Sequence, residues 1–317
     1  MFEDIIKRLS KFEKFFRFPR NVILLIKILF STKPNNFKAI NDLHKSQLEL
    51  KKCKSNIANL IKSLIFADDE NLVLSKQAEY SIFSQHGEDG ITLKLLNRIN
   101  LNYGRFIEFG AGGYSSNTQI LASMGWAGAC IDGNSYDLDV AKKSFEERQI
   151  DIRNIKFSKA WITKNNINDV IDDNVAGEID LLSIDLDGVD YWLLEAVTPK
   201  PKIIILEYNA SFGPDEILSV PYTDDFYRWD GKFSPKGWYY GASLRAYDRL
   251  MRTKGYQLIY CESSGVNAFY LRNDIGQKYQ IPIKSIEEAF YPDISRTKGT
   301  TVCEQLAHLK AYELINL

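Results

Sequence analysis

Acidic side chains gather in the stretch SIDLDGVDYW and recur in LEYN, each time after an apolar run. Asp185 and Asp187 are two residues apart, as are Glu207 and Asn209, so each pair shares one side of an extended chain. Oxygen ligands from two adjacent strand ends suit Mg²⁺ or another divalent cation. We therefore predict Asp185, Asp187, Glu207 and Asn209 as metal ligands. The alternative is that Asp185 and Glu207 bind substrate hydroxyls without a metal.

The stretch SQHGEDG holds a second candidate for chemistry. It is polar, has a glycine break, and precedes an amphipathic segment. Its histidine, His86, belongs to the residue type that titrates near neutral pH and can take a proton from a hydroxyl group. His86 is therefore a predicted catalytic base, and Asp187 is the rival. The alternative role for His86 is structural, at the start of a helix.

A glycine-rich turn, GAGG, follows the apolar run RFIEF, and Glu108 lies inside that run. In open α/β sheets, ligands bind at the carboxyl ends of the strands. A dinucleotide-binding turn would place its third glycine where this chain has Ser115. A preceding carboxylate also serves a pyrophosphate poorly. Glu108 suits a cationic ligand group instead, unless the turn is an ordinary strand–helix connection.

Asp132 ends the next apolar run, GACID. It lies about 20 residues after the glycine turn, where a carboxylate can accept two hydrogen bonds from a ribose diol. Nicotinamide-binding proteins share this feature, so Asp132 becomes informative only in combination with Glu108.

Seven apolar runs must position these residues: RFIEFG, AGACID, IKFSKAWI, IDLLSID, KIIILEYN, YQLIYCE and NAFYLR. The first five are almost continuously apolar, as strands buried on both faces are. Amphipathic stretches such as NTQILASMG, DLDVAKKSFEERQ and SLRAYDRLMRTKG separate most of them and predict helices. The alternation predicts an α/β fold with a doubly wound, Rossmann-like sheet. The stretch CEQLAHLKAYEL predicts one further helix near the C-terminus.

With 317 residues, 45% of them hydrophobic, the chain can bury a full core and carry an appendage. We predict a helical arm over residues 1–70, the sheet domain over 71–275 and a helical extension over 276–317. The first 66 residues hold 14 Lys and Arg against 5 Asp and Glu, although the whole chain has a net charge of −1. A basic arm on an acidic domain suggests contact with an anionic membrane surface or glycan, unless it is only a solvated helical face.

The arm carries a short heptad pattern, with Leu43, Leu50, Ile57 and Leu64 seven residues apart. This spacing predicts either a coiled coil that forms a homodimer or a helical hairpin packed on the chain's own domain. The run VILLIKILF is interrupted by Lys27 and falls far short of the ~20 residues that span a bilayer. The arm could instead lie in a membrane interface. Nothing resembles a cleaved signal peptide, so we predict a cytoplasmic location, with peripheral contact to the inner face of the membrane.

The pattern apolar-apolar-Glu-apolar-Gly-x-Gly around Glu108 resembles motif I of class I S-adenosylmethionine-dependent methyltransferases. The chain also resembles a bacterial FkbM-related group, which is often associated with surface-polysaccharide and other glycan biosynthesis. This resemblance is carried by the stretches YSIFSQHGEDGI, SNT, GWAGACID, LLSIDLDGVDYW, IILEYN, YYGASLRA and GVNAFY. The resemblance covers roughly residues 80–272. It implies S-adenosylmethionine as cofactor, bound by Gln85, Glu108, Gly110, Gly112, Asn117, Asp132, Ala160, Trp161 and Asp185.

The same resemblance implies a role for several of these residues. The glycines let the backbone approach the methionine and ribose parts of the cofactor, and Glu108 helps to orient the amino acid end. Asp132 binds the ribose, and Ala160 and Trp161 flank the adenine. The acidic stretches are also similar to metal-dependent O-methyltransferases, which use an Asp after the fourth strand and an Asp-Asn pair after the fifth. This chain departs from that pattern, because its second pair is Glu-x-Asn.

We therefore predict an O-methyltransferase that acts on a sugar or glycan hydroxyl, nucleotide- or lipid-linked, in polysaccharide biosynthesis, with no nucleic-acid partner. The aromatic-rich stretch YTDDFYRWDGKFSPKGWYYGAS predicts a substrate loop, because Tyr and Trp faces stack on sugars. One alternative is a nicotinamide-dependent oxidoreductase, which the GAGG turn and Glu108 disfavour. Another is a non-catalytic scaffold, which the joint presence of Glu108, Asp132, Asp185 and Glu207 disfavours.

Overall fold

The structure is a computed structural model, and it describes residues 74–229 and 236–317. The predicted arm over 1–70, with its coiled coil and its membrane-surface helices, lies outside the described residues. All described residues belong to one compact unit.

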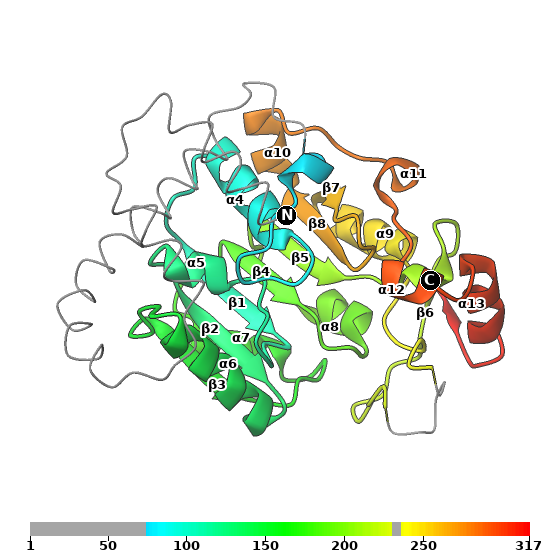
Figure 1. The fold of residues 1–317 in the computed structure, drawn as a ribbon, viewed down its shortest axis with the longest axis horizontal. Helices are drawn as coiled ribbons and strands as arrows, with labels where there is room; N and C mark the ends of the chain where they lie inside the picture. The colour runs from blue at the N-terminus through cyan, green and yellow to red at the C-terminus, as the bar shows by residue number, and fades with distance from the viewer. Residues whose placement is uncertain (1–73, 230–235) are drawn as a thin grey trace, which may run out of the picture. The chain divides into compact units, whose positions relative to one another are not determined.

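A seven-stranded sheet in the described residues has the order β3-β2-β1-β4-β5-β8-β7 (Figure 1). The strands are β1 (Arg105–Phe109), β2 (Ala127–Asp132), β3 (Ile155–Lys159), β4 (Leu181–Ile184), β5 (Ile203–Glu207), β7 (Tyr256–Cys261) and β8 (Asn267–Arg272). Strands β1 to β5 pair in parallel, whereas β8 pairs antiparallel with both β5 and β7. Each strand coincides with one of the seven predicted apolar runs, and the predicted α/β sheet is confirmed.

The central strands are buried on both faces, which explains their continuous apolar runs. In β1, Phe106 belongs to one hydrophobic core, and Ile107 and Phe109 belong to the other. All three side chains are fully buried. The same alternation continues in β5, where Ile203 and Ile205 face the core of Phe106.

Helices cover both faces, as a doubly wound sheet requires. One core includes side chains of α7 (Ile167–Asn174), α8 (Asp190–Ala196) and α9 (Leu244–Lys254). The other includes side chains of α4 (Glu88–Arg98), α5 (Gln119–Ser123) and α6 (Ser135–Glu147), with α10 (Asn273–Tyr279) packed against it. Helix α9 begins where the Ser243 hydroxyl accepts from the Ala246 amide, and it ends at Gly255 in the left-handed region.

Short elements complete the described part of the chain. They are η1 (Lys76–Ala78), η2 (Ala210–Phe212), β6 (Leu218–Ser219), α11 (Ile286–Ala289), α12 (Ile294–Thr297), α13 (Val302–Leu309) and β9 (Ile315–Asn316). The predicted helix CEQLAHLKAYEL is confirmed over its first part as α13, which begins with a capping box formed by Thr301 and Glu304 and ends at Leu309. Strand β9 pairs antiparallel with β6, so the end of the chain returns to the segment that follows β5. Within residues 74–229 and 236–317, no helix is both long and apolar enough to cross a membrane.

Candidate active site

A cleft of about 500 Å³ opens at the carboxyl ends of β1, β2 and β4. Strand order reverses between β1 and β4, and open α/β sheets bind their ligands at such a point. Seven predicted site residues line the cleft: Gly110, Gly112, Asp132, Ala160, Trp161, Asp185 and Asp187. A second hollow of about 270 Å³ shares Gly110, Gly112 and Asp185 with the cleft and adds Gln85, Glu108 and Asn117.

The glycine turn holds three strand ends together. Gly110 has φ +78°, and a Cβ there would lie 1.6 Å from the carbonyl oxygen of Asp185. The amides of Gly110 and Ala111 both donate to the carbonyl of Ile131, at 3.0 and 3.2 Å. A Cβ on Gly112 would lie 2.8 Å from Oδ2 of Asp132. The absent side chains therefore let the ends of β1, β2 and β4 approach one another, and at Gly110 the space is filled by the chain itself.

Glu108 is held by the loop that follows the glycine turn. Its side chain is almost fully buried, and one carboxylate oxygen accepts from the hydroxyls of Ser116 and Thr118 at 2.5 and 2.6 Å. The other oxygen accepts from the amide of Asn117 at 2.7 Å. Burial raises the pKa of Glu108, and these hydrogen bonds oppose the rise. Glu108 thus fixes the SNT loop over the end of β1, and it borders the second hollow from that position.

Asp132 and Trp161 line the end of the cleft beside β2 and β3. Oδ1 of Asp132 accepts from the amide of Asn134 at 2.7 Å, and partial burial raises the pKa of Asp132. The Trp161 indole lies against Gly133, where a Cβ would be 2.8 Å from Cε3. Its Nε1 donates to the carbonyl of Asp224 at 2.6 Å, and about half of the residue remains exposed. A carboxylate and an aromatic face thus stand together, an arrangement that can receive a diol and a flat ring.

The SQHGEDG loop and the SNT loop place their predicted site residues differently. Gln85 and Asn117 line the second hollow, and Nδ2 of Asn117 donates to the hydroxyl of Ser183 at 3.2 Å. The backbone amide of His86 donates to Glu88 at 2.8 Å, and His86 lines neither the cleft nor the second hollow. The structure therefore brings Gln85 and Asn117 to the site and leaves the predicted base His86 outside it.

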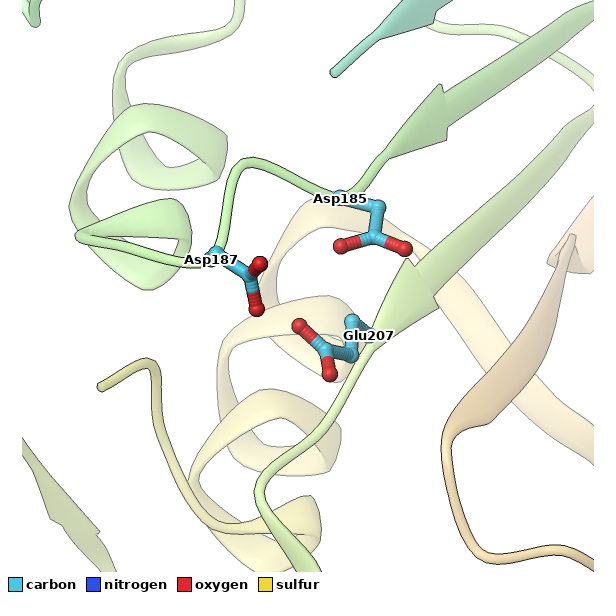
Figure 2. Close-up of side chains that lie close together, drawn as sticks. All are labelled: Asp185, Asp187 and Glu207. Atoms are coloured by element: carbon cyan, nitrogen blue, oxygen red, sulfur yellow. The ribbon is translucent and has the colours of Figure 1, made fainter. Parts of the chain in front are cut away.

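Three carboxylates converge beyond the ends of β4 and β5 (Figure 2). Asp185, Asp187 and Glu207 each offer an oxygen within 4.8 Å of the others. Burial and the neighbouring Asp190 raise the pKa of Asp185 to about 7. Burial and Asp185 raise the pKa of Glu207 well above its usual range. Facing carboxylates this close require a proton or a cation between them.

The two oxygens of Glu207 have different surroundings. Oε1 accepts from the Tyr240 hydroxyl at 2.8 Å. Oε2 is buried and has no hydrogen-bond partner. A buried carboxylate oxygen without a partner is costly, because it has lost its hydration without compensation. A proton shared with Asp185, or a bound cation, would compensate this oxygen.

Arg228 is a site residue that sequence reasoning missed. Its guanidinium forms an ion pair with Asp187 and lies 3.8 Å from the centre of the Tyr240 ring. Asp187 itself has φ +53°, in the left-handed region. The carboxylate of Asp190 closes the loop around it by accepting hydrogen bonds from the amides of Leu186 and Gly188. Arg228 lies 41 residues after Asp187, outside the apolar periodicity, so no sequence signal joins the two.

The prediction of Asn209 as a fourth metal ligand is corrected by its contacts. Its Nδ2 donates to the carbonyls of Trp238 and Tyr240 at 2.7 and 2.9 Å. Its Oδ1 accepts from the Ser211 amide at 3.1 Å and from Arg296 at 2.9 Å. The period of two does not extend to Asn209, because β5 ends at Glu207 and Asn209 caps η2. The acidic group therefore consists of three carboxylates.

No known family profile and no curated protein matches this chain. Several solved structures are similar to it. An S-adenosylmethionine-dependent methyltransferase from Clostridium acetobutylicum ATCC 824 is 13% identical, with 69% of this chain and 99% of that chain covered and a TM-score of 0.39. An O-methyltransferase from Bacillus cereus in complex with SAH is 14% identical, with 68% and 88% covered and a TM-score of 0.37. A putative O-methyltransferase from Klebsiella pneumoniae is 13% identical, with 81% and 98% covered and a TM-score of 0.38. These identities and TM-scores are too low to carry an argument about function.

Proposed function

We propose that the protein is an S-adenosylmethionine-dependent O-methyltransferase that acts on a sugar or glycan hydroxyl. One observation carries the proposal: a single cleft runs from Asp132 and Trp161, past the glycine turn, to Asp185 and Asp187. A nucleoside bound at the first end would extend its sulfur-bearing chain over the turn. The reactive methyl group would then face the acidic residues.

The charges around the turn support this cofactor over a dinucleotide. The second hollow is bordered by the carboxylates of Glu88, Glu108 and Asp185. S-adenosylmethionine carries a sulfonium and an ammonium group, and a nearby carboxylate stabilises either cation. The pyrophosphate of a nicotinamide dinucleotide would meet the same carboxylates with repulsion. We therefore place the amino acid end of the cofactor in the second hollow and its ribose on Asp132.

The reaction we propose is an in-line displacement. The acceptor oxygen forms a bond to the methyl carbon, the carbon–sulfur bond breaks, and its electron pair stays on sulfur as a neutral thioether. The hydroxyl proton passes to a carboxylate, for which Asp187 is placed, since it lines the cleft and its side chain is about half exposed. The chain's main contribution is to align donor and acceptor.

A divalent cation fits the acidic group. The three carboxylates offer oxygens within 4.8 Å of one another, and Oε2 of Glu207 is buried without a partner. Asp185, Asp187 and Glu207 would hold the ion. When bound, it would lower the pKa of the acceptor hydroxyl and neutralise the clustered charge.

Aromatic side chains on the cleft support a sugar acceptor. Phe226, Tyr227 and Trp229 line it, and more than half of Tyr227 and of Trp229 is exposed. Such faces stack on the C–H surfaces of sugars, while their polar edges remain hydrated. We further propose that the basic arm brings the enzyme to an anionic surface or to a second copy of itself.

Incubation of the full chain with methyl-labelled S-adenosylmethionine and a panel of nucleotide-linked sugars and glycans tests the proposal. Mass spectrometry should find label in one class of acceptor. The variant Asp132→Ala should weaken cofactor binding, whereas Asp139→Ala removes an exposed carboxylate from α6 that does not line the cleft and should leave cofactor binding unchanged. Binding of NAD in place of S-adenosylmethionine would reject the methyltransferase. Cofactor binding without transfer to any glycan would reject the acceptor class.

A further inference from the structure

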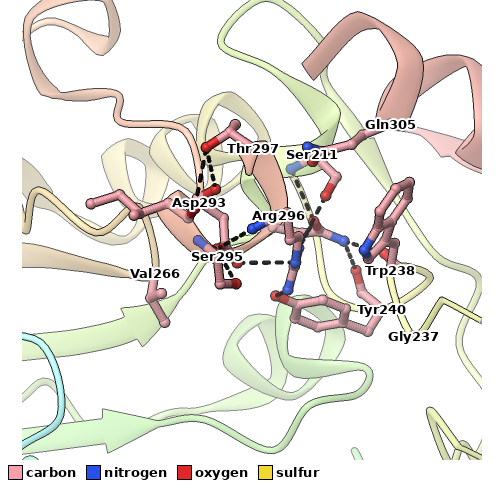
Figure 3. Close-up of polar contacts among 12 residues, drawn as sticks. Ser211, Gly237, Trp238, Tyr240, Val266, Asp293, Ser295, Arg296, Thr297 and Gln305 are labelled. Carbon is pink, nitrogen blue, oxygen red and sulfur yellow. Dashed lines mark hydrogen bonds and ion pairs between the residues drawn. The ribbon is translucent and has the colours of Figure 1, made fainter. Parts of the chain in front are cut away.

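A buried arginine from the C-terminal segment contacts Tyr240, the residue whose hydroxyl donates to Glu207 of the acidic group. Figure 3 shows this arginine, Arg296, among its polar contacts. Arg296 belongs to α12, and only 10% of its side chain is exposed. It pairs with Asp293 at 3.0 Å and donates to Oδ1 of Asn209 at 2.9 Å and to the hydroxyl of Ser211 at 3.0 Å. Its Nη2 donates to the hydroxyl oxygen of Tyr240 at 2.7 Å. The guanidinium is therefore fixed from several sides at once.

The contact with Tyr240 determines where the phenol proton points. Arginine has donors only, so the Tyr240 oxygen must accept from Arg296. The phenol then has its single proton left to donate, and it donates to Oε1 of Glu207 at 2.8 Å. Because Oε1 is engaged in this way, Oε2 is the oxygen without a partner in the group where the three carboxylates face one another (Figure 2).

We propose that Arg296 is a positioning residue: through Tyr240 it sets the direction of one proton and thereby the orientation of Glu207 toward Asp185 and Asp187. Arg296 does not line the cleft, so it acts through Tyr240 and not on a ligand. The effect expected on turnover rests on the proposed function. The direction of the Tyr240 proton does not depend on it.

The charged and titratable groups around Glu207 come from four parts of the chain. Asp185, Asp187 and Asp190 follow β4, Tyr247 lies on α9, Arg228 and Tyr240 precede α9, and Arg296 lies on α12. Both arginines contact the Tyr240 ring, with their guanidinium carbons 3.8 Å and 5.1 Å from its centre. Arg228 lines the cleft and can respond to a ligand, whereas neither Arg296 nor its partners line the cleft. The two cations therefore have separate tasks.

The hydrogen bond that the Tyr240 hydroxyl donates to Glu207 can be observed without any reaction. A buried, hydrogen-bonded phenol proton exchanges slowly, so Tyr240 should give a low-field proton NMR signal that Tyr240→Phe removes. We expect Arg296→Met to shift or abolish this signal. Arg245→Met is the matched control, because Arg245 ties α11 to the body through Glu287 at 2.6 Å and has no contact with Tyr240. An unchanged signal in Arg296→Met, or the same change in Arg245→Met, would overturn the proposal.

Turnover provides the second readout. Loss of a charge-assisted contact corresponds to a fall in kcat of roughly ten- to a hundredfold. We expect this fall in Arg296→Met and in Tyr240→Phe, with an unchanged KM for S-adenosylmethionine. The double variant should be no slower than either single variant, and Arg296→Lys should restore part of the rate. If the losses of rate in the two single variants add in the double variant, Arg296 does not act through Tyr240. If Arg296→Met does not fold, the same measurements on Arg296→Lys and Tyr240→Phe test the role of Arg296. If the wild-type chain transfers no methyl group, the proposed function is rejected, and the NMR signal still tests the role of Arg296.

Discussion

Replacing Gly110 by alanine tests whether the glycine turn serves the protein's own packing. Gly110 has φ +78°, and its added Cβ would lie 1.6 Å from the carbonyl oxygen of Asp185. That oxygen belongs to the backbone and cannot rotate away as the end of a flexible side chain could. The loop after β4 must therefore move, together with Asp185.

The expected cost has two parts. A residue other than glycine in the left-handed region costs about 1–2 kcal/mol. Forcing an extra carbon into a packed site costs about 1–3 kcal/mol more. Gly110→Ala should therefore lower the free energy of unfolding by roughly 2–5 kcal/mol, which is a large share of the ~5–15 kcal/mol that a typical domain has.

Gly113→Ala is the matched control from the same turn. Gly113 has φ +91°, and nothing lies within 4 Å of its added Cβ, so only the conformational cost of about 1–2 kcal/mol applies. Urea unfolding followed by circular dichroism gives both values. Calorimetric titration with S-adenosylhomocysteine should show weaker binding for Gly110→Ala, because Asp185 moves. Equal unfolding free energies for the two variants would refute the packing role of Gly110.

Three further outcomes are expected. Asp132→Ala should weaken binding of S-adenosylhomocysteine by about ten- to a hundredfold in calorimetry, the loss expected for a charge-assisted contact, and unchanged affinity would remove Asp132 from the cofactor site. Activity should fall after exhaustive chelation and return with Mg²⁺, whereas full activity in the chelated enzyme would assign Asp185, Asp187 and Glu207 to direct substrate binding. Burial raises the pKa of Asp89 to about 6 in the folded chain, against about 4 unfolded, so its stabilising contribution is complete below about pH 4 and is lost as pH rises through about 6. Asp89→Asn should reduce the fall of the unfolding free energy between pH 4 and 7, to which Asp185, with its pKa of about 7, also contributes. A fall as steep as in the wild type would show that Asp89 makes no contribution.

The strands and the acidic residues at their ends were accessible from sequence for physical reasons. A strand buried on both faces must be apolar along its whole length, so β1 to β5 stand out from the surrounding chain. Parallel strands end at one edge, so residues just after β4 and β5 had to meet there. That reasoning brought Asp185, Asp187 and Glu207 together correctly.

The remaining parts of the site depend on contacts that periodicity does not encode. Arg228, Tyr240 and Arg296 come from irregular or short segments, and only the folded chain brings them to Glu207. Asn209 was assigned to the wrong side because a period of two holds only while the strand continues, and β5 ends at Glu207. The same premise was wrong for Asp185 and Asp187, which follow the end of β4 at Ile184, and the loop at Asp187, with φ +53°, brings their carboxylates together instead.

The position of β8 has a consequence for the order of folding. It pairs with β5 so that Ile203 lies opposite Leu271, and the 59 residues between the two strands must be made before this edge of β5 is covered. During synthesis, the five parallel strands can therefore assemble while one edge of β5 still exposes its unpaired amide and carbonyl groups. Exposed edges of this kind pair with other chains. A nascent chain stalled shortly after β5 would be vulnerable to aggregation until β7 and β8 emerge.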